Sequence, residues 1–557
     1  MNHAARSDVG AAPAWTLPLL LAAGALTALD NVWDAGVIKI AVCALLAGAL
    51  LLPALAWRGR DAIGAWFTSA GGRLLLLSTA LALPMAWEAV QLSTVTDRML
   101  LFGLANVAAV SGLAAARARP GALGWSVTAV AAVAAGVCLA QAAGLEQTLT
   151  PGPEEVVGLA GNSIRAGALC ALGLVAAAGR LLVPAGATAR SALSSVLAGG
   201  GVALISAALL LTRARGARWV ALAALLVLLV LAWRRHGAGL RRGALTLALA
   251  LLAGLAVAAA VGGSDALSGR KLEQQAPILS GRDLTTGVRL ELYRGALQML
   301  ADHPGLGVGF GRYAQHAGAY RSPDEAALPG LAGGITVAEH PHNELLLAFV
   351  EGGWPAGLLL LALLVLALRR AWRRAARCEG HAGLVDLGLL ATGMLLGLGQ
   401  DAWSDPGTAL VFFAALGAAF SATPAGRADG EAPHPSEIPH PSDRAALPGL
   451  AGALLALLLG AGLIVGAWPR LDAHMSLRSF LLRTEAEGRI TPTGFHLLQH
   501  AAETAPGDEA VQRLLLDFGQ LYLPTVYNDD GKEQVQDVLF EAQRRLHALA
   551  PIPGDGR

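Results

Sequence analysis

The chain has 557 residues, of which 55% are hydrophobic and 15% are charged, and its formal net charge is +1. Soluble domains carry about 25% charged residues, so this composition, with a mean hydropathy of +0.54, excludes a large soluble protein and predicts an integral membrane protein. A net charge close to zero says little about binding partners, because the distribution of the charges matters more than their sum. We expect no nucleic-acid partner. The four cysteines lie in or beside apolar stretches without a CxxC pair, so we expect neither a disulfide framework nor a metal knuckle.

The first apolar stretch, Trp15 to Leu29, follows a single arginine and superficially resembles a signal peptide. Further spans follow it and no convincing small-residue cleavage site does, so we interpret it as the first membrane helix.

Apolar stretches of about 20 residues recur along the chain, and each is long enough to cross a bilayer as a helix. They predict an all-α polytopic membrane protein with about 13 transmembrane helices. The stretches lie near 14–29, 36–57, 74–92, 99–116, 121–143, 166–184, 191–211, 218–233, 244–262, 344–368, 383–400, 407–423 and 449–468.

Basic residues fall mainly in alternate connections, which predicts the orientation. By the positive-inside rule these connections are cytoplasmic, so the N-terminus lies inside, and the 263–343 loop and the C-terminus lie outside. The connections hold Arg58, Arg60 and Arg73; Arg117 and Arg119; Arg180 and Arg190; Arg234, Arg235, Arg241 and Arg242; and Arg369, Arg370, Arg373, Arg374 and Arg377.

Four arginines break this pattern, because they lie at the outer ends of spans. They are Arg165 in the 161–167 stretch and Arg213, Arg215 and Arg218 in the 212–218 connection. Such residues can reach back to lipid phosphates, or one span can be miscounted. The alternative that we favour is an anion site, since guanidinium groups bind phosphate in a bidentate manner.

The long outer loop contains a helical pattern and a glycine string. Leu290, Tyr293, Leu297 and Leu300 recur at helical spacing, which predicts an amphipathic helix over 288–301. The string at 303–313 lacks a P-loop lysine and a strand-to-helix unit, so we exclude nucleotide binding. We expect a tight turn that returns the chain toward His342.

The loop ends in Glu339-His340-Pro341-His342-Asn343-Glu344, at the head of an apolar span. Histidine titrates near neutrality and is the usual general base, so His342 is the main candidate, with His340 second to it. A metal site built from His340, His342 and Glu344 is the alternative. We do not favour it, because no fourth ligand stands out and Pro341 constrains the approach of the two histidines.

The remaining regions are a linker and a C-terminal domain. The proline- and histidine-rich 424–447 segment predicts a cytoplasmic linker of low structure content. Helical runs near 473–487, 494–503, 508–522 and 532–549 predict a small helical domain on the outer face; its paired helices resemble a tetratricopeptide-like stack, although no 34-residue repeat is present. The expected division is therefore 1–262, 263–343, 344–468 and 469–557.

Several of these motifs, in this order, carry a resemblance. Arg289 and Tyr293 are followed by His-Pro-x-x-Gly-x-Gly at 303–309 and by His-Asn-Glu at 342–344, with Glu351-Gly352-Gly353 in the next helix. This order resembles the bacterial O-antigen ligase superfamily, which includes O-antigen ligases, O-antigen polymerases and protein O-oligosaccharyltransferases. Gly161-Asn162 and Arg215-Gly216 add to the similarity, which covers roughly 155–400. Ser163, Ile164 and Ala214 depart from the residues that are common at their positions in the family.

The resemblance implies a GT-C-type glycosyltransferase of the bacterial inner membrane that needs no metal or other cofactor. Its donor would be a glycan on undecaprenyl diphosphate, and its acceptor lipid A core, a protein Ser or Thr, or another lipid-linked glycan. His342, Arg289 and Arg215 are the expected catalytic residues. The expected diphosphate-binding residues are Arg165, Arg213, Arg218 and Asn162, and the expected supporting residues are His340, Asn343, Glu344 and Tyr293. A lipid-linked glycan flippase is the alternative from another class, although the charges cluster at the outer interface and not mid-span.

Overall fold

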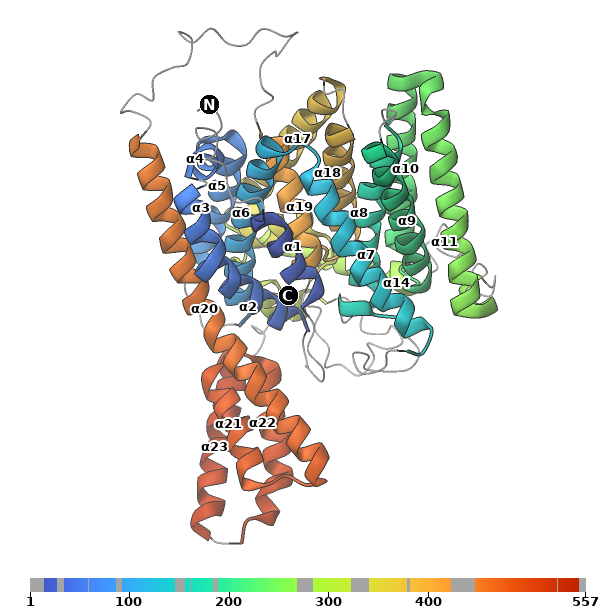
Figure 1. Cartoon of the computed structure of the whole chain (residues 1–557). Coiled ribbons are helices and arrows are strands. Elements are labelled where there is room, and N and C mark those ends of the chain that lie inside the picture. Colours follow the sequence, from blue (N-terminus) through green and yellow to red (C-terminus); the bar gives the residue numbers. More distant parts are fainter. Residues whose placement is uncertain are drawn as a thin grey trace, which may run out of the picture.

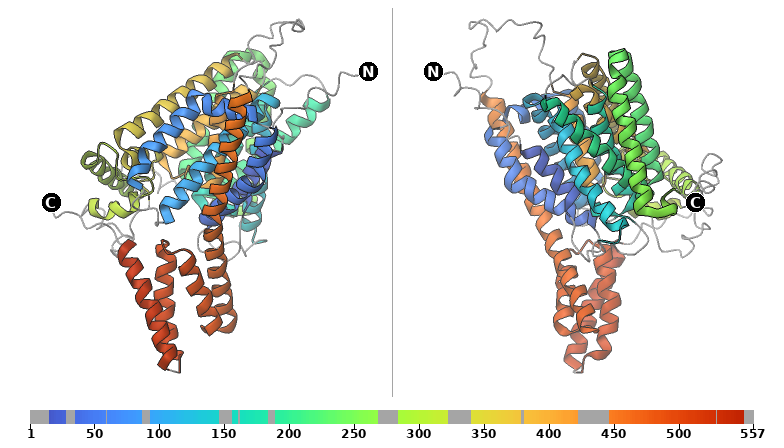
Figure 2. Two further views of the ribbon diagram at one scale, coloured as in Figure 1. Left: turned by 90° about the vertical axis from the view of Figure 1, so that its left-hand side faces the viewer. Right: turned by 45° about the vertical axis from the view of Figure 1, so that its right-hand side comes forward.

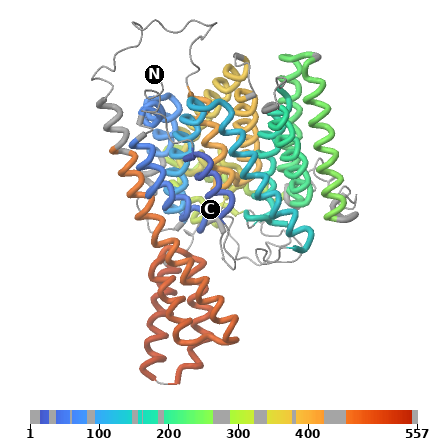
Figure 3. Tube along the Cα trace, in the orientation of Figure 1, coloured from blue at the N-terminus to red at the C-terminus, as the bar shows by residue number. Residues whose placement is uncertain are grey.

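The computed structural model describes residues 15–27, 35–58, 60–86, 93–145, 156–160, 162–183, 189–267, 284–321, 340–377, 381–421, 446–527 and 529–549 (Figure 3). All regular elements in these ranges are helices. The predicted 424–447 linker lies almost wholly outside the described residues.

Thirteen apolar helices of the described chain correspond to the thirteen predicted stretches. Most ends differ by a few residues, but the helices predicted to end at 368 and 468 continue to Arg377 and Glu487. Ten are long and apolar enough to cross a membrane, and three are shorter. The long ones are the continuous run of α2 (Ala35–Leu46), η1 (Ala47–Leu51) and α3 (Leu52–Arg58), then α6 (Ser93–Ala118), α7 (Ala122–Ala142), α8 (Ser163–Leu181), α9 (Ala189–Leu211), α10 (Arg215–His236), α11 (Arg241–Leu267), α17 (Glu344–Arg377), α18 (His381–Gly399) and α20 (Ala446–Glu487). The shorter ones are α1 (Thr16–Leu26), α5 (Ala70–Ala86) and α19 (Pro406–Ala419). The all-α polytopic fold is therefore confirmed.

Small residues bring the central helices together. Gly112 of α6 lies so close to α19 that an added Cβ would come 2.0 Å from the carbonyl oxygen of Ala414, and Gly417 of α19 approaches the backbone of Ala109 in the same way. Glycine permits such backbone contact, which is the usual basis of helix packing in membranes. Helices α10 and α11 lie at the periphery (Figure 1) and expose leucines on their outer faces, as suits a surface in contact with lipid tails.

Helix α17 is broken near its first third, and the glycine string fills the break. Gly353 has φ +66° and Pro355 follows, so the regular hydrogen-bond ladder cannot continue there. The backbone N–H groups of Val308 and Gly309 donate to the carbonyls of Val350 and Glu351, both at 2.9 Å. The string is thus a tight loop, as predicted, and it packs onto α17 at the break.

The glycines in this loop are required because its backbone lies in direct contact with the backbones of neighbouring helices. A Cβ at Gly307, where φ is +66°, would lie 2.3 Å from the carbonyl oxygen of Val350, and one at Gly353 would lie 2.2 Å from that of Gly305. A Cβ at Gly311 would meet the backbone of Val95 at 2.7 Å. The loop therefore fixes the first part of α17 against the beginning of α6.

The C-terminal part is a separate helical layer at the end of the bundle where α14 (Leu284–Asp302) also lies (Figures 1 and 2). Helix α20 continues through Pro469 without interruption, so the expected boundary between 468 and 469 falls inside one helix. Helices α21 (Pro492–Thr504), α22 (Glu509–Tyr522) and α23 (Asp529–Leu549) pack on its end. Their core includes Phe480, Phe495 and Leu498, and the predicted helical runs are confirmed.

Candidate active site

The histidine motif is held at the start of α17 by a local cap. The side-chain oxygen of Asn343 accepts the N–H of Leu346 at 3.0 Å, which is the usual way to satisfy a first-turn donor. His342, one residue earlier, has φ +52°, a left-handed conformation that non-glycine residues adopt rarely. Such strain is typical of functional positions, and 41% of the His342 side chain is exposed.

Asp401 joins His342 to an arginine. Its Oδ1 lies 3.8 Å from Nδ1 of His342, and its Oδ2 lies 3.8 Å from Nη2 of Arg165 at the start of α8. Asp401 belongs to the short connection between α18 and α19, so the three groups come from three separate parts of the chain. The result is a row of imidazole, carboxylate and guanidinium, which we call the His342 row.

The charge of Asp401 is stabilised by this row. Burial by itself raises the pKa of a carboxyl group, but contact with His342 and the positive charge of Arg165 outweigh burial and lower the pKa of Asp401. Asp401 is therefore ionised throughout the neutral range. The ionised carboxylate faces Nδ1 of the imidazole, so Nε2 lies at the other side of the ring, away from Asp401.

Arg98, from the first turns of α6, organises the other half of the motif. One of its Nη atoms donates to Ser404 Oγ at 2.9 Å, and the other lies 3.2 Å from Nδ1 of His340. The Arg98 guanidinium is also 3.7 Å from the carboxylate of Glu344. Arg98 thus links α6 to α17 and to the α18–α19 connection.

Glu344 and His340 are held in place by these neighbours. Oε1 of Glu344 accepts the N–H groups of Trp403 and Ser404 at 3.1 and 3.0 Å, and the Ser404 hydroxyl at 2.8 Å. Burial and the positive charge of Arg98 lower the pKa of His340 to about 3. Glu344 is thus engaged by the α18–α19 connection and by Arg98, and His340 is neutral at physiological pH.

Helix α14 approaches the motif from the long loop and confirms the helix predicted over 288–301. The hydroxyl of Tyr293 donates to the carbonyl oxygen of His342 at 3.5 Å. Arg289 lies four residues earlier and therefore on the same face of α14. That face is the one directed toward the start of α17.

The remaining predicted residues lie at the starts of α8 and α10. Asn162 caps α8, since its side-chain oxygen accepts the N–H of Ile164 at 2.7 Å. Arg215 is the first residue of α10; a Cβ on the next residue, Gly216, would lie 2.6 Å from the amide of Gln400, the neighbour of Asp401. This contact brings the start of α10 beside the His342 row.

Arg218 and Arg213 have more local surroundings. Arg218 donates to the carbonyls of Leu209 and Leu210 at 3.3 and 2.6 Å, which satisfies the C-terminal end of α9. Arg213 lies in the tight α9–α10 connection with φ +56°. The structure gives Arg218 a helix-capping contact that the sequence does not reveal.

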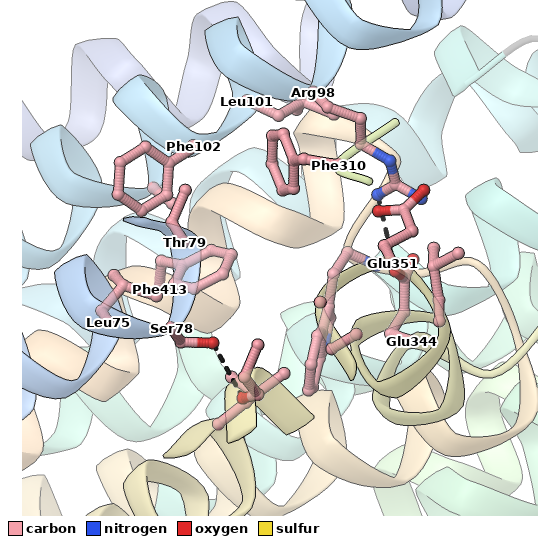
Figure 4. Close-up of a pocket in the computed structure, with 17 residues that line it drawn as sticks. Leu75, Ser78, Thr79, Arg98, Leu101, Phe102, Phe310, Glu344, Glu351 and Phe413 are labelled. Carbon is pink, nitrogen blue, oxygen red and sulfur yellow. Dashed lines mark hydrogen bonds and ion pairs between the residues drawn. The ribbon is translucent and has the colours of Figure 1, made fainter. Parts of the chain in front are cut away.

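A cavity opens beside Arg98 (Figure 4), with about 760 Å³ of space when its part open to solvent is included. Apolar side chains from α5, α6, α17 and α19 form most of its wall, including Leu75, Phe102 and Phe413. Arg98 and Glu344 lie together at one end, as Figure 4 shows. The space is therefore amphipathic, with a charged end at the histidine motif and an apolar body within the bundle.

The sequence analysis missed Asp401, Ser404 and Arg98. Arg98 stands at the outer end of a predicted span, so the criterion that selected Arg165 also applies to it. Asp401 and Asp405 flank a short connection between two apolar stretches. Carboxylates beside membrane-spanning stretches are rare and often functional, so both could have been selected as candidate site residues. The pairing of Asp401 with His342 depends on helix packing.

Comparison with known proteins identifies part of the chain. No curated protein matches it. Residues 200–361 match a family model described as O-Antigen ligase, and this range holds Arg215, Arg289 and His342. Asp401, Arg165 and Arg98 lie outside the match and complete the site from other parts of the chain. The chain therefore carries a domain of the O-antigen ligase superfamily of membrane glycosyltransferases.

Proposed function

We propose that the protein transfers a glycan from undecaprenyl diphosphate to an acceptor hydroxyl at the periplasmic face of the inner membrane. The observation that carries this proposal is the His342 row, which combines a base with its orienting carboxylate and a guanidinium at one end of a membrane bundle. The match to the O-antigen ligase family supports the same reaction class.

In the proposed reaction the acceptor oxygen attacks the anomeric carbon of the first sugar. Nε2 of His342 takes the proton of that hydroxyl as the new carbon–oxygen bond forms. The bond between the anomeric carbon and the diphosphate breaks, and its electron pair leaves with the diphosphate. A single displacement of this kind inverts the configuration at the anomeric carbon.

Arginines stabilise the leaving group in this proposal. Arg165, Arg215 and Arg289 stand on three helices that begin or pass beside the His342 row, and guanidinium groups match the geometry of phosphate oxygens. They neutralise the negative charge that the diphosphate gains as the sugar departs. Arg213 and Asn162 border the same region, whereas Arg218 acts mainly through the end of α9.

The cavity beside Arg98 suits the hydrocarbon part of the donor. Its apolar wall lies within the membrane-spanning helices and its charged end adjoins the histidine motif. A polyprenyl chain placed there positions its diphosphate near the start of α17, since burial of apolar surface favours that orientation.

The acceptor is the finer part of the proposal. We favour a ligase-type transfer, with lipid A core or a protein Ser or Thr as acceptor. The helical layer formed by α21, α22 and α23 adds a surface on the side of the site, as suits a protein acceptor. A polymerase that joins two lipid-linked glycans is the alternative.

The test is transfer by the purified protein in lipid nanodiscs. Lipid-linked glycan is supplied with lipid A core, with a pilin-like protein or with a second lipid-linked chain, and released undecaprenyl diphosphate is measured. We expect release that depends on one acceptor and is abolished by His342→Ala. Normal release in His342→Ala or in Arg289→Ala would refute the assigned role of that residue. Absence of release with every acceptor, together with movement of the donor across the bilayer of sealed proteoliposomes, would favour a flippase.

A further inference from the structure

A buried arginine ties the C-terminal layer to the membrane bundle. Arg470, on α20 just beyond Pro469, forms a bidentate pair with Asp97 of α6, through Nε at 3.1 Å and Nη2 at 2.7 Å. Its Nη1 donates to Oδ2 of Asp508 at 2.8 Å. His474, one turn further along α20, lies 3.5 Å from the same oxygen. We call these four residues the Arg470 cluster.

The Arg470 cluster restrains both the distance and the relative orientation of α6 and α20. Arg470 is only 6% exposed, and a bidentate fork on a carboxylate restrains the relative orientation of both side chains. Asp508 is restrained in turn, because its Oδ1 accepts the N–H of Val511 and so caps α22. Burial by itself raises the pKa of Asp508, but contact with His474, the positive charge of Arg470 and the N–H of Val511 outweigh burial and lower that pKa.

The next residue after Asp97 is Arg98, which holds the histidine motif. Consecutive side chains of a helix point about 100° apart. Within one turn of α6, Asp97 therefore points toward Arg470 and Arg98 points toward the site. Arg98 contacts His340, Ser404 and Glu344 through a single guanidinium. A shift of the first turn of α6 therefore changes the position of Arg98 at the site.

We infer that the Arg470 cluster positions Arg98, and that the C-terminal layer thereby sets the geometry of the active site. Asp97 and Arg470 are positioning residues in this account, since their contacts described above are with each other and with Asp508. The inference rests on the proposed function for its catalytic consequence, but the coupling itself is a structural property that can be measured without activity.

The test is hydrogen exchange of the full chain in nanodiscs, read at the amides of Trp403 and Ser404. Both amides donate to Glu344, whose other oxygen faces Arg98, so they report on the position of Arg98. Arg470→Met removes the pairs with both Asp97 and Asp508 and leaves only the contact between His474 and Asp508. Asp97→Asn weakens only the contact with α6 and leaves the pair between Arg470 and Asp508. We expect exchange about tenfold faster at both amides in both variants, the usual scale of coupling through a contact network.

Arg513→Met is the matched control, because it removes an exposed arginine pair with Glu509 inside the C-terminal layer and should leave the two amides unchanged. Wild-type exchange at Trp403 and Ser404 in Asp97→Asn would overturn the inference, even if Arg470→Met loosens the C-terminal helices. In the transfer assay, Asp97→Asn should lower kcat about tenfold while the donor KM stays within about twofold. Absence of transfer in the wild-type protein would refute the proposed function and leave the exchange result standing.

Discussion

The most direct test of the His342 row is Asp401→Asn, which removes one negative charge and keeps the shape of the side chain. Asp401 lies 3.8 Å from both Arg165 and His342. At that distance and an effective dielectric near 20, two unit charges interact by about 4 kcal/mol, which applies to the pair with Arg165 and, once His342 has taken the acceptor proton, to the pair with His342. The side chains are partly exposed, so solvent screening reduces each contribution to about 1 kcal/mol.

A loss of about 1 to 2 kcal/mol from the reacting state corresponds to a decrease of about tenfold in kcat/KM. The assay is release of undecaprenyl diphosphate by the purified variant, with Asp302→Asn as the control. Asp302 accepts a hydrogen bond from Tyr320 at the end of α14, apart from the row. Wild-type kcat/KM in Asp401→Asn would refute the reasoning.

Four further predictions follow from particular contacts. The pKa of His340 is lowered to about 3 in the folded protein, so the unfolded chain takes up this proton at higher pH, and the free energy of unfolding should fall below about pH 6.5, by about 2 kcal/mol at pH 5. In His340→Asn the melting temperature should therefore change less between pH 7 and pH 5 than in the wild type, and an unchanged pH dependence would contradict this. Gly307→Ala should destabilise the fold by about 1–3 kcal/mol, because φ at this residue is +66° and the new Cβ would meet the carbonyl oxygen of Val350. Gly305→Ala is the control, since its Cβ would meet nothing within 4 Å, and equal melting temperatures of the two variants would refute the close contact. Arg218→Ala should lower thermal stability by about 1 kcal/mol through loss of its bonds to α9 and reduce kcat less than Arg165→Ala does; the reverse order of kcat values would place Arg218 at the diphosphate. In intact cells, a cysteine at Tyr527, which is 99% exposed, should react with a membrane-impermeant thiol reagent while one at Arg119 should not, and the opposite labelling would invert the proposed orientation.

The amino-acid sequence by itself determines the elements of this protein. The thirteen apolar helices, the helix predicted over 288–301 and the C-terminal helices follow from hydrophobic length and periodicity, which are local properties of the chain. The sequence also identifies the histidine motif, because polar residues at the head of an apolar span are conspicuous. Asn343 and Asn162 are recognisable caps for the same local reason.

Only the tertiary structure decides which groups meet at that motif. Arg98 and Ser404 are 306 residues apart, and Asp401 reaches His342 and Arg165 from a connection that has no sequence pattern in common with either. These contacts depend on which helices pack side by side and in which rotation, and close packing of small residues decides that for the whole bundle at once. The same holds for Arg470, whose partners Asp97 and Asp508 lie on either side of it in space but far from it along the chain. Periodicity gives each helix its apolar face, but the partner of a charged side chain is fixed only when all the helices have packed.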